Sequence, residues 1–391
     1  MIFASAEVAL RRSRVVPWIS ARPLLAFAGA ALLLWAVLPL AYHWDVPQDN
    51  LEQLTWALTP DWGYTKHPPF PTWVLIAFQQ VLPNGLWLTF ALGAAQVALM
   101  MAVAFTLTAE LYGRRAAVVA VLLIGLLTYY TQRLHFYNHN TALLVAHALA
   151  CLCVWRALVR GGTLWWWLLG LVWGAGLLSK YQMVLTIACN LAYLVLATRG
   201  SPWREERRDL VRGVLLAGTV AALAILPHVI WLVRNDFPTF GYASHSMAAD
   251  LPLAARPRDI AAFLGNQVGR CLPALLLGAL LLLLERRPRS AVPSAQLAAR
   301  ALPQGLSPAA GTAAARWLLP VHALGPFILM TALSAFLGVD LQMHWGTAFL
   351  WLMVPLALGT RAGRRLTQVP LMQVYAGALL VHLLQLAAHS L

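Results

Sequence analysis

One short stretch of the chain combines ionisable and aromatic side chains, as a site for charged ligands requires. Asp49, Glu52, Lys66 and His67 lie close together in sequence, directly after the first long apolar segment. The chain is 60% hydrophobic and only 11% charged, so such groups are expected to face water, a ligand or one another. The segment from Asp49 to Trp73 is therefore the first candidate for a chemical site.

Length and composition place the chain among integral membrane proteins. It has 391 residues, a mean hydropathy of +0.69, and repeated apolar runs whose lengths match the hydrocarbon thickness of a bilayer. A soluble globular protein is excluded, and we predict an all-α polytopic membrane protein. The net charge of +14 would favour nucleic acid in a soluble protein. Here the basic residues lie mostly in short loops, so orientation among membrane lipids explains them and no nucleic-acid partner is expected.

The apolar runs predict a bundle of about eleven transmembrane helices. The first outer loop also contains two helix-like stretches that are too short to span a bilayer, and their tryptophans favour a position along the membrane surface. The expected spans are 24–41, 86–108, 116–130, 141–157, 163–178, 181–198, 211–233, 263–284, 317–337, 345–360 and 369–387.

The basic residues sort to one side of this predicted membrane. Most of the 28 lysines and arginines fall in loops that share a side with the N-terminus. Because positively charged loops stay in the cytoplasm, we expect a multi-pass protein of the plasma (inner) membrane with an internal N-terminus. The Asp49–Trp73 segment then lies on the periplasmic or extracytoplasmic side. The remaining cations map to that outer side as well: Lys66, Arg133, Lys180, Arg234, Arg256, Arg258 and Arg270.

The same pattern predicts how the chain is organised. Residues 285–316 are rich in Ala, Pro and Arg with little periodicity, which is typical of a flexible linker rather than a domain. The expected parts are a cytoplasmic N-terminal segment (1–23), a catalytic transmembrane module (24–284) with outer loops 42–85, 131–140 and 234–262, the cytoplasmic linker (285–316), and C-terminal transmembrane helices (317–391).

Cysteines and histidines give little indication of a metal or cofactor. Three histidines, His67, His135 and His139, could converge on zinc, and the last two are four residues apart. No carboxylate completes a helical metal motif, so we expect no metal and no cofactor, with zinc left as the alternative. The four cysteines all fall in apolar segments, where they favour simple burial: Cys151, Cys153, Cys189 and Cys271.

Several short motifs occur in a fixed order on the predicted outer side. They begin with D-x-x-E-Q from Asp49 and W-G-Y-x-K-H-P-P from Trp62, and continue with 136–141, 178–182 and 231–242. In this order the chain resembles the family 39 glycosyltransferases. These are GT-C membrane enzymes that include protein O-mannosyltransferases and the aminoarabinose transferase of lipid A. The resemblance covers roughly residues 24–270, with a weaker echo at His344-Trp345.

The resemblance implies transfer of a sugar from a polyprenyl-phosphate donor, at the outer face, to a lipid, glycan or protein acceptor. The absence of a large soluble domain favours a lipid or small glycan acceptor. In the family an Asp of the first outer loop is the catalytic base, and Asp49 is the matching residue. An attacking hydroxyl needs such a proton acceptor, and a single displacement with one base inverts the anomeric carbon. The alternative is that Asp49 and Glu52 only cap a surface helix.

The other site candidates also keep two interpretations. Glu52 would orient the acceptor or hold a cation such as Lys66, and otherwise is the capping partner. Lys66, which a diproline holds in an extended segment, would bind the donor phosphate or else extend to lipid headgroups. Lys180 and Arg270 lack an acidic neighbour in sequence, so a donor phosphate would stabilise them, unless they lie at helix ends open to water.

The second outer loop adds further side chains that donate hydrogen bonds. Arg133 is a candidate for the donor phosphate, and Asn138 and His139 are candidates for substrate binding, together with Tyr64 and His67. Related enzymes often carry an acidic residue near this point, whereas this chain has Asn138-His139-Asn140. That departure weakens any inference of a carboxylate-bound metal.

Two other classes of function compete with the enzyme. A transporter or flippase for an anionic lipid-linked sugar would use the outer cations to capture a headgroup. It should show related halves with broken helices and charges along a path across the membrane, and the sequence shows neither. A non-catalytic scaffold would tolerate loss of the charges in its outer loop.

Overall fold

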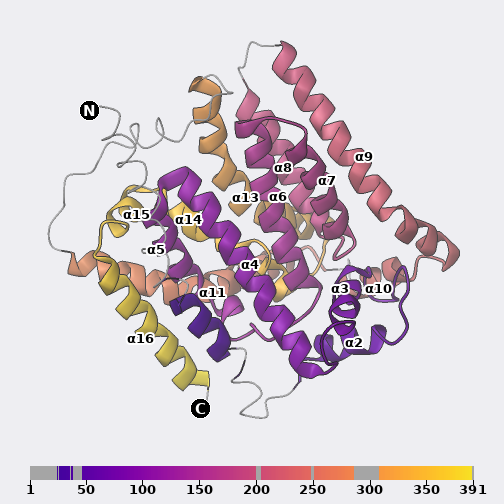
Figure 1. Ribbon diagram of the computed structural model, residues 1–391, viewed down its shortest axis with the longest axis horizontal. Helices are drawn as coiled ribbons and strands as arrows, with labels where there is room; N and C mark the ends of the chain where they lie inside the picture. Colours follow the sequence, from indigo (N-terminus) through magenta and orange to yellow (C-terminus); the bar gives the residue numbers. More distant parts are fainter. Residues whose placement is uncertain are drawn as a thin grey trace, which may run out of the picture.

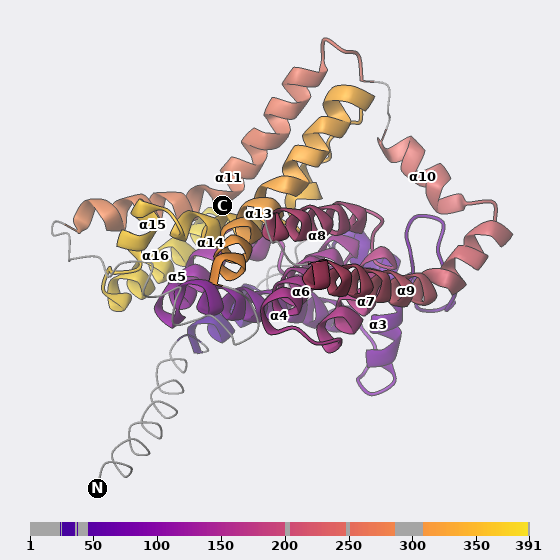
Figure 2. The ribbon, with the colours of Figure 1, turned by 90° about the horizontal axis from the view of Figure 1, so that it is seen from above.

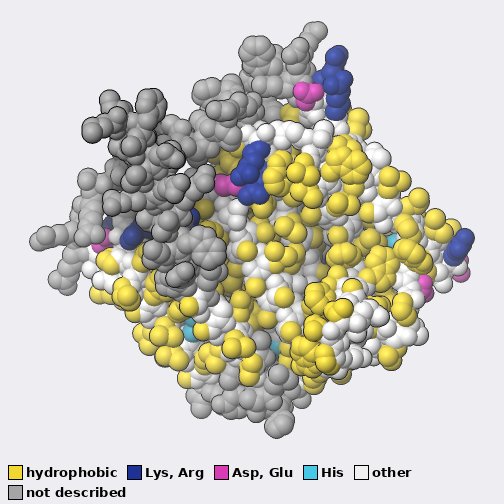
Figure 3. All heavy atoms as spheres, viewed as in Figure 1, with side chains coloured by type: hydrophobic (Ala, Val, Ile, Leu, Met, Phe, Trp, Pro, Cys, Tyr) yellow, Lys and Arg dark blue, Asp and Glu magenta, His cyan; other side chains and the backbone are white. Residues whose placement is uncertain are grey.

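The computed structural model describes residues 24, 26–35, 37, 46–199, 204–247, 251–285 and 308–389, and in these ranges all regular structure is helical. Figure 1 shows long helices lying side by side, with the shorter helices gathered at the ends of the bundle. Apolar side chains cover most of the face seen in Figure 3, and its few charged side chains lie near helix ends. A bilayer requires this distribution.

A central group of helices surrounds α6. It consists of α4 (Leu86–Tyr112), α6 (His139–Arg160), α7 (Leu164–Leu177), α8 (Met183–Thr198), α9 (Arg204–Arg234) and α13 (Pro308–Leu337). Helix α6 packs against α4, α7, α8 and α13, and most of its apolar window is buried inside the protein. It is therefore the axis of the module, and its first turn carries candidate site residues.

Helices α7 and α9 approach closely because one of them presents glycines. A Cβ atom on Gly170 of α7 would lie 2.6 Å from the carbonyl oxygen of Ala217 on α9, and one on Gly174 would lie 2.7 Å from the Cβ of Ala224. Small residues commonly allow such backbone contact between membrane helices, where close packing replaces hydrophobic burial as the source of stability. This contact fixes α7, whose end precedes Lys180.

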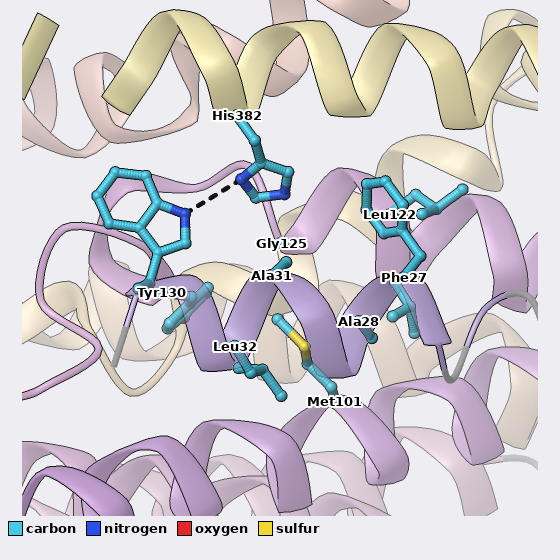
Figure 4. Close-up of a pocket in the computed structure, with 11 residues that line it drawn as sticks. Phe27, Ala28, Ala31, Leu32, Met101, Leu122, Gly125, Tyr130 and His382 are labelled. Atoms are coloured by element: carbon cyan, nitrogen blue, oxygen red, sulfur yellow. Dashed lines mark hydrogen bonds between the residues drawn. The ribbon is translucent and has the colours of Figure 1, made fainter. Parts of the chain in front are cut away.

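A second group of helices packs on one side of this centre. It contains α5 (Arg114–Ile124), α11 (Arg256–Leu284), α14 (Met353–Leu358), α15 (Arg361–Leu366) and α16 (Leu371–His389). The helix Ala26–Trp35 also belongs here, because the Trp35 indole Nε1–H donates to Nδ1 of His382 on α16 at 3.3 Å (Figure 4). In Figure 2, α11 and α13 extend together beyond the remaining helices.

Two of the predicted spans are wrong. Residues 345–360 form short 3₁₀ turns, Met343–Gly346 and Leu350–Leu352, followed by the six-residue α14. Residues 116–130 form α5, about 16 Å long, and then the 3₁₀ turn η1 (Thr128–Tyr130). Both segments are apolar because the protein interior surrounds them: Phe349 and Trp351, for example, are fully buried.

The number of long helices is also smaller than expected. Six helices in the described ranges are long and apolar enough to cross a bilayer, and four shorter apolar helices accompany them. Two of the shorter ones, α7 and α8, match the predicted spans 163–178 and 181–198. The count of eleven is not confirmed in the described ranges, because some apolar segments there are buried against protein.

Some predicted boundaries differ from the observed helices. Helix α13 begins at Pro308, within the predicted linker 285–316, and α11 begins at Arg256, within the predicted loop 234–262. The short helix α10 (Pro238–Met247) occupies the first part of that loop. Residues 1–23 and 286–307 lie outside the described residues, so the predicted N-terminal segment and most of the linker do too.

Candidate functional site

The first predicted outer loop folds onto the start of α6 through a buried asparagine. Helix α2 (Gln48–Trp56) carries Asn50, whose side chain is completely buried. Its amide nitrogen donates to Thr89 Oγ1 and to the His135 carbonyl, both at 2.9 Å, while its oxygen accepts from the Tyr137 amide at 3.0 Å. One side chain thereby joins α2, α4 and the loop 131–138, and it places neighbouring Asp49 beside α6.

We expect Asn50→Leu to lower the free energy of unfolding by at least about 2 kcal/mol, because the substitution removes three hydrogen bonds and leaves buried backbone groups unpaired. Thermal unfolding of the purified protein in detergent measures this effect. The matched control is Gln48→Leu, which makes a similar change on the exposed side of the same helix. Equal stability of the two variants would show that Asn50 does not hold α2 in place.

A second buried contact joins α2 to α3 (Phe70–Gln79). Gln53 is almost fully buried, and its Oε1 accepts from Thr72 Oγ1 at 2.9 Å. Residues 50 and 53 lie on one face of α2 because they are three positions apart. The sequence analysis did not identify this polar face, since neither side chain is charged.

Asp49 binds the residue that caps α6. Its Oδ2 accepts from Asn138 Nδ2 at 2.8 Å. Asn138 is the N-cap residue of α6, and its Oδ1 accepts from the backbone amides of Asn140 and Thr141. A carboxylate near a helix N-terminus is stabilised by the partial positive charge there. Asn138, a predicted substrate-binding residue, thus also positions the predicted base.

The alternative that Asp49 and Glu52 form a capping box is wrong. The N-cap residue of α2 is Pro47, and no side chain caps this helix. Glu52 instead accepts two hydrogen bonds from the Lys66 ammonium, at 2.9 and 3.0 Å. This contact agrees with the predicted role of Glu52 in holding a cation. Both carboxylates therefore have partners outside α2.

The Lys66 ammonium is held in place by its ion pair with Glu52. It also lies 5.6 Å from the centre of the Tyr242 ring of α10. Burial lowers the pKa of Lys66, but the hydrogen bond and charge of Glu52, together with Tyr242 and Asp49, raise it by more, so the net direction is upward. Lys66 therefore remains a cation over the physiological pH range, and it points to the protein rather than to lipid.

Lys180 lies between α7 and α8 and forms no ion pair with a described carboxylate. Its ammonium donates to Asn140 Oδ1 at 2.6 Å. Burial lowers the pKa of Lys180 to about 8, although the charge of Asp49 partly opposes this shift. Lys180 is half-buried in the cavity wall, so the predicted alternative, a helix end open to water, is met only in part. An anion would stabilise the ammonium.

The rings of two predicted histidines contact each other at a tilt. The ring centres of His67 and His139 are 4.0 Å apart. His139 Nε2 lies 3.3 Å from the Pro68 carbonyl, which only accepts, so this nitrogen carries the hydrogen. Burial, and then the charges of His139 and Lys180, lower the pKa of His67 far below its usual range. The imidazole of His67 is therefore neutral and serves as a hydrogen-bonding group.

These side chains surround one cavity of about 580 Å³. Six predicted site residues line it, and Asp49 is the only carboxylate among its described lining residues. The apolar part of the wall comes from α8, α10 and α13, and includes Leu185, Phe240 and Leu333. The six predicted residues are Asp49, Lys66, His67, Arg133, Asn138 and Lys180.

Four predicted residues lie behind this lining. Glu52 binds Lys66, His139 contacts the His67 ring, and Arg270 lies over the Tyr129 ring with 4.7 Å between the guanidinium carbon and the ring centre. Tyr64 is buried, stacks on Trp56 at 5.0 Å, and donates to the Trp56 carbonyl. Tyr64 therefore packs the loop onto α2 and does not face the cavity, contrary to its expected contact with substrate.

The structure adds lining residues that the sequence analysis did not select. They include Gln182, Thr239, Tyr242 and His344, from three separate segments. Gln182 Oε1 and Thr239 Oγ1 are buried and have no hydrogen-bond partner among the described residues. Burial lowers the pKa of His344 to about 3, with help from Lys180, Arg133 and Lys66. All four positions fall within the family motifs 178–182 and 231–242 or the echo at His344-Trp345, but none was selected as a site residue.

Within the described ranges, no three or more His, Cys, Asp or Glu side chains are placed to hold a metal ion. The third predicted zinc candidate, His135, is buried against Phe90 with 5.5 Å between ring centres. Its ring lies in the packing between the loop and α4, so it does not join the His67–His139 pair in a common site.

Residues 66–231 match the family model described as dolichyl-phosphate-mannose-protein mannosyltransferase. The resemblance to the family 39 glycosyltransferases is confirmed. The chain is 31% identical over 221 residues to the lipopolysaccharide core galacturonosyltransferase RgtA of Rhizobium johnstonii, and 30% identical over 234 residues to RgtB of the same organism. These matches cover 53% and 58% of this chain, but only 42% and 44% of the two relatives.

The family 39 resemblance extends to the fold. The crystal structure of ArnT from Cupriavidus metallidurans in the apo state matches 90% of this chain and 60% of that one, with a TM-score of 0.61 and 18% identity. ArnT bound to undecaprenyl phosphate matches 93% of this chain and 76% of that one, with a TM-score of 0.57 and 19% identity. The protein therefore has the GT-C fold that the sequence predicted.

Proposed function

We propose that the protein transfers a sugar from a polyprenyl-phosphate donor to a hydroxyl group of a lipid, glycan or protein acceptor. The carrying observation is the cavity, which combines one carboxylate, two lysines and an apolar wall. Such a donor has a lipid tail, an anionic phosphate and an anomeric carbon, and each of these parts has a matching surface. The relatives support this proposal, since RgtA and RgtB are galacturonosyltransferases and a crystal structure of ArnT contains bound undecaprenyl phosphate.

In this proposal the cations hold the donor phosphate. Lys66 and Lys180 both line the cavity, and the charge of Asp49 acts on both of them. As the bond between the anomeric carbon and the phosphate oxygen breaks, its electron pair goes to the phosphate. Ammonium groups fixed beside that oxygen stabilise the developing charge in a site sheltered from water.

Asp49 accepts the proton of the attacking hydroxyl. The acceptor oxygen forms a bond to the anomeric carbon while the proton moves to the carboxylate. Asn138 fixes the orientation of that carboxylate, so less reorganisation is needed during the reaction. A single displacement inverts the anomeric configuration. Glu52 does not line the cavity and acts through Lys66, as a positioning residue.

The sugar itself has polar partners in the wall. Gln182 Oε1 and Thr239 Oγ1 have unused hydrogen-bonding capacity, and sugar hydroxyls would pair with them. His67, which is neutral, offers a further polar group at the same cavity. A lipid or small glycan acceptor would enter from the membrane surface. We place the reaction on the extracytoplasmic face of the plasma (inner) membrane, from the distribution of basic residues.

A liposome assay tests the proposed function. Purified protein is reconstituted with a radiolabelled polyprenyl-phosphate sugar and an extract of envelope lipids and glycans. Label that moves to an acceptor supports the transferase. Label that crosses the bilayer on its original lipid supports a flippase, and the absence of both supports a scaffold. The last two results would each contradict the proposal.

The pKa of Lys180 gives a prediction for pH dependence. An ammonium binds phosphate only when protonated, so donor affinity should fall as the pH rises through about 8, the pKa of Lys180 in the unliganded protein. Lys66 keeps its charge there, because its pKa is raised. The Kd for undecaprenyl phosphate, measured from pH 6 to about 10, should therefore rise above pH 8. Lys180→Arg should lose this alkaline rise, since arginine stays protonated.

A further inference from the structure

Arg133 and Arg270 form a pair that the proposed reaction does not use. Arg133 follows η1 and lines the cavity, whereas Arg270 lies on α11 behind Tyr129, another lining residue. The Arg270 guanidinium lies 4.7 Å from the Tyr129 ring centre, and the Arg133 guanidinium 5.2 Å from that of Phe136. Arg133 thus lines the cavity directly, whereas Arg270 lies outside the lining and contacts the ring of the lining residue Tyr129.

Neither guanidinium has a carboxylate partner among the described residues. The Arg133 side chain forms no hydrogen bond there, and Arg270 makes only long contacts, 3.4 Å to Asn266 Oδ1 and 3.3 Å to Thr128 Oγ1. Burial lowers the pKa of Arg133, and the charge of Arg270 lowers it further. As a whole residue Arg133 is exposed, and Arg270 is half-buried. Two like charges held near each other repel, so an anion that binds beside them is favoured.

A count of formal charges around the cavity leaves an excess of positive charge on Arg133 and Arg270. Asp49 and Glu52 carry two negative charges, which balance the positive charges of Lys66 and Lys180. A donor phosphodiester adds a single negative charge to that balanced set. The two arginines therefore supply more positive charge than the donor phosphate requires, and guanidinium groups suit the paired oxygens of a carboxylate or phosphate.

We propose that Arg133 and Arg270 form a second anion-binding subsite, separate from the donor phosphate site at Lys66 and Lys180. It binds a carboxylate or phosphate group carried by the transferred sugar or by the acceptor. This assignment rests on the proposed function, and it divides the four cations that the sequence analysis assigned to one phosphate. The enzyme would accordingly discriminate in favour of a substrate with an anionic group beyond the donor phosphate.

Binding measurements on the full-length protein in detergent test the subsite. Undecaprenyl phosphate reports the donor site. Glucuronate represents an anionic sugar, and a glucosamine disaccharide phosphate represents an anionic acceptor. Calorimetry measures the Kd of the last two on protein already saturated with undecaprenyl phosphate. The variants are Arg133→Gln and Arg270→Lys, with Arg258→Gln as the matched control, because Arg258 is exposed and does not line the cavity.

We expect Arg133→Gln to weaken binding of at least one soluble anion by about tenfold or more, as loss of a charge-assisted contact requires, while Arg258→Gln leaves it unchanged. Arg270→Lys, which keeps the charge but loses the planar contact of the guanidinium with the Tyr129 ring, should weaken it as well. The anion that binds identifies the source: glucuronate indicates the sugar, and the disaccharide phosphate indicates the acceptor. The Kd of undecaprenyl phosphate should change less than about twofold.

Two results would overturn the subsite. One is that Arg133→Gln weakens undecaprenyl phosphate binding as much as Lys66→Met does, because the arginine would then belong to the donor phosphate site. The other is that neither soluble anion depends on the arginines. If wild-type protein fails to bind undecaprenyl phosphate, the proposed donor is wrong. The anions are then measured on the lipid-free protein, so the two proposals fail separately.

Discussion

Replacing Asp49 by asparagine is expected to lower kcat by at least about 100-fold, with little change in donor affinity. An amide cannot take the proton of the attacking hydroxyl, yet it has nearly the same shape as the carboxylate. It also still accepts a hydrogen bond from Asn138, so α2 and the start of α6 should keep their positions. Steady-state transfer and the Kd of undecaprenyl phosphate, measured on the same purified preparation, separate catalysis from binding.

The matched control for this substitution lies in the same loop. Asp61 is exposed and outside the cavity lining, and its carboxylate accepts from the Trp62 amide at 2.7 Å. Asp61→Asn makes the same chemical change and should keep kcat within about twofold of wild type. Transfer by Asp49→Asn at a rate close to that of Asp61→Asn would remove Asp49 from the mechanism.

Replacing Lys66 by methionine is expected to weaken donor binding by about 30-fold or more. Loss of one partner from a partly buried, hydrogen-bonded charge pair costs roughly 2 kcal/mol or more, and each 1.4 kcal/mol is a factor of ten. The substitution removes a phosphate ligand and also leaves the negative charge of Glu52 behind the cavity wall. The Kd for undecaprenyl phosphate at pH 7 measures the loss.

The Glu52→Gln variant distinguishes two roles of Lys66: binding of the donor phosphate, and structural support through its ion pair with Glu52. If Lys66 binds the phosphate, neutralising Glu52 frees the ammonium and donor affinity stays the same or improves. If the ion pair only maintains the structure, Glu52→Gln should be as harmful as Lys66→Met. In the first case the double variant should also bind the donor better than Lys66→Met alone, because the uncompensated carboxylate is gone.

The charged part of the site was predictable because charge is rare in this chain. Asp49, Lys66 and Lys180 stand out against apolar sequence, and the membrane orientation assigned them to one face. The structure brings all three to one cavity. The neutral residues were not predictable in this way. Gln182 and Thr239 come from separate segments, and only the folded chain shows that both residues line one cavity.

Capping patterns and aromatic residues misled the sequence analysis. The spacing of Asp49 and Glu52 suits a capping box. In the structure Asn138, far along the chain, donates to Asp49, and Lys66, in the loop after α2, donates to Glu52. Tyr64 lies beside the charged motif and was expected to touch substrate, whereas stacking on Trp56 buries it. Long-range partners decide such cases, and a single sequence does not contain them.

The fold class was predictable from apolar run lengths, and the number of spans was not. The segment 345–360 is as apolar as a true span, yet Phe349 and Trp351 lie inside the protein. Hydropathy does not distinguish a protein interior from lipid, since both exclude water. The glycines that let α7 approach α9 likewise make a fourteen-residue helix part of the bundle although it is short for a bilayer.

Donor choice and product configuration together test the central claim most directly. The purified protein is given one sugar in two forms, linked to undecaprenyl phosphate or to a nucleoside diphosphate, with the same envelope acceptor. We predict transfer only from the undecaprenyl phosphate form, and a product in which the anomeric configuration of the donor is inverted, as determined by nuclear magnetic resonance. Transfer from the nucleotide form, or a product that retains the donor configuration, would contradict a single displacement at a lipid-phosphate site by an acceptor hydroxyl that Asp49 deprotonates.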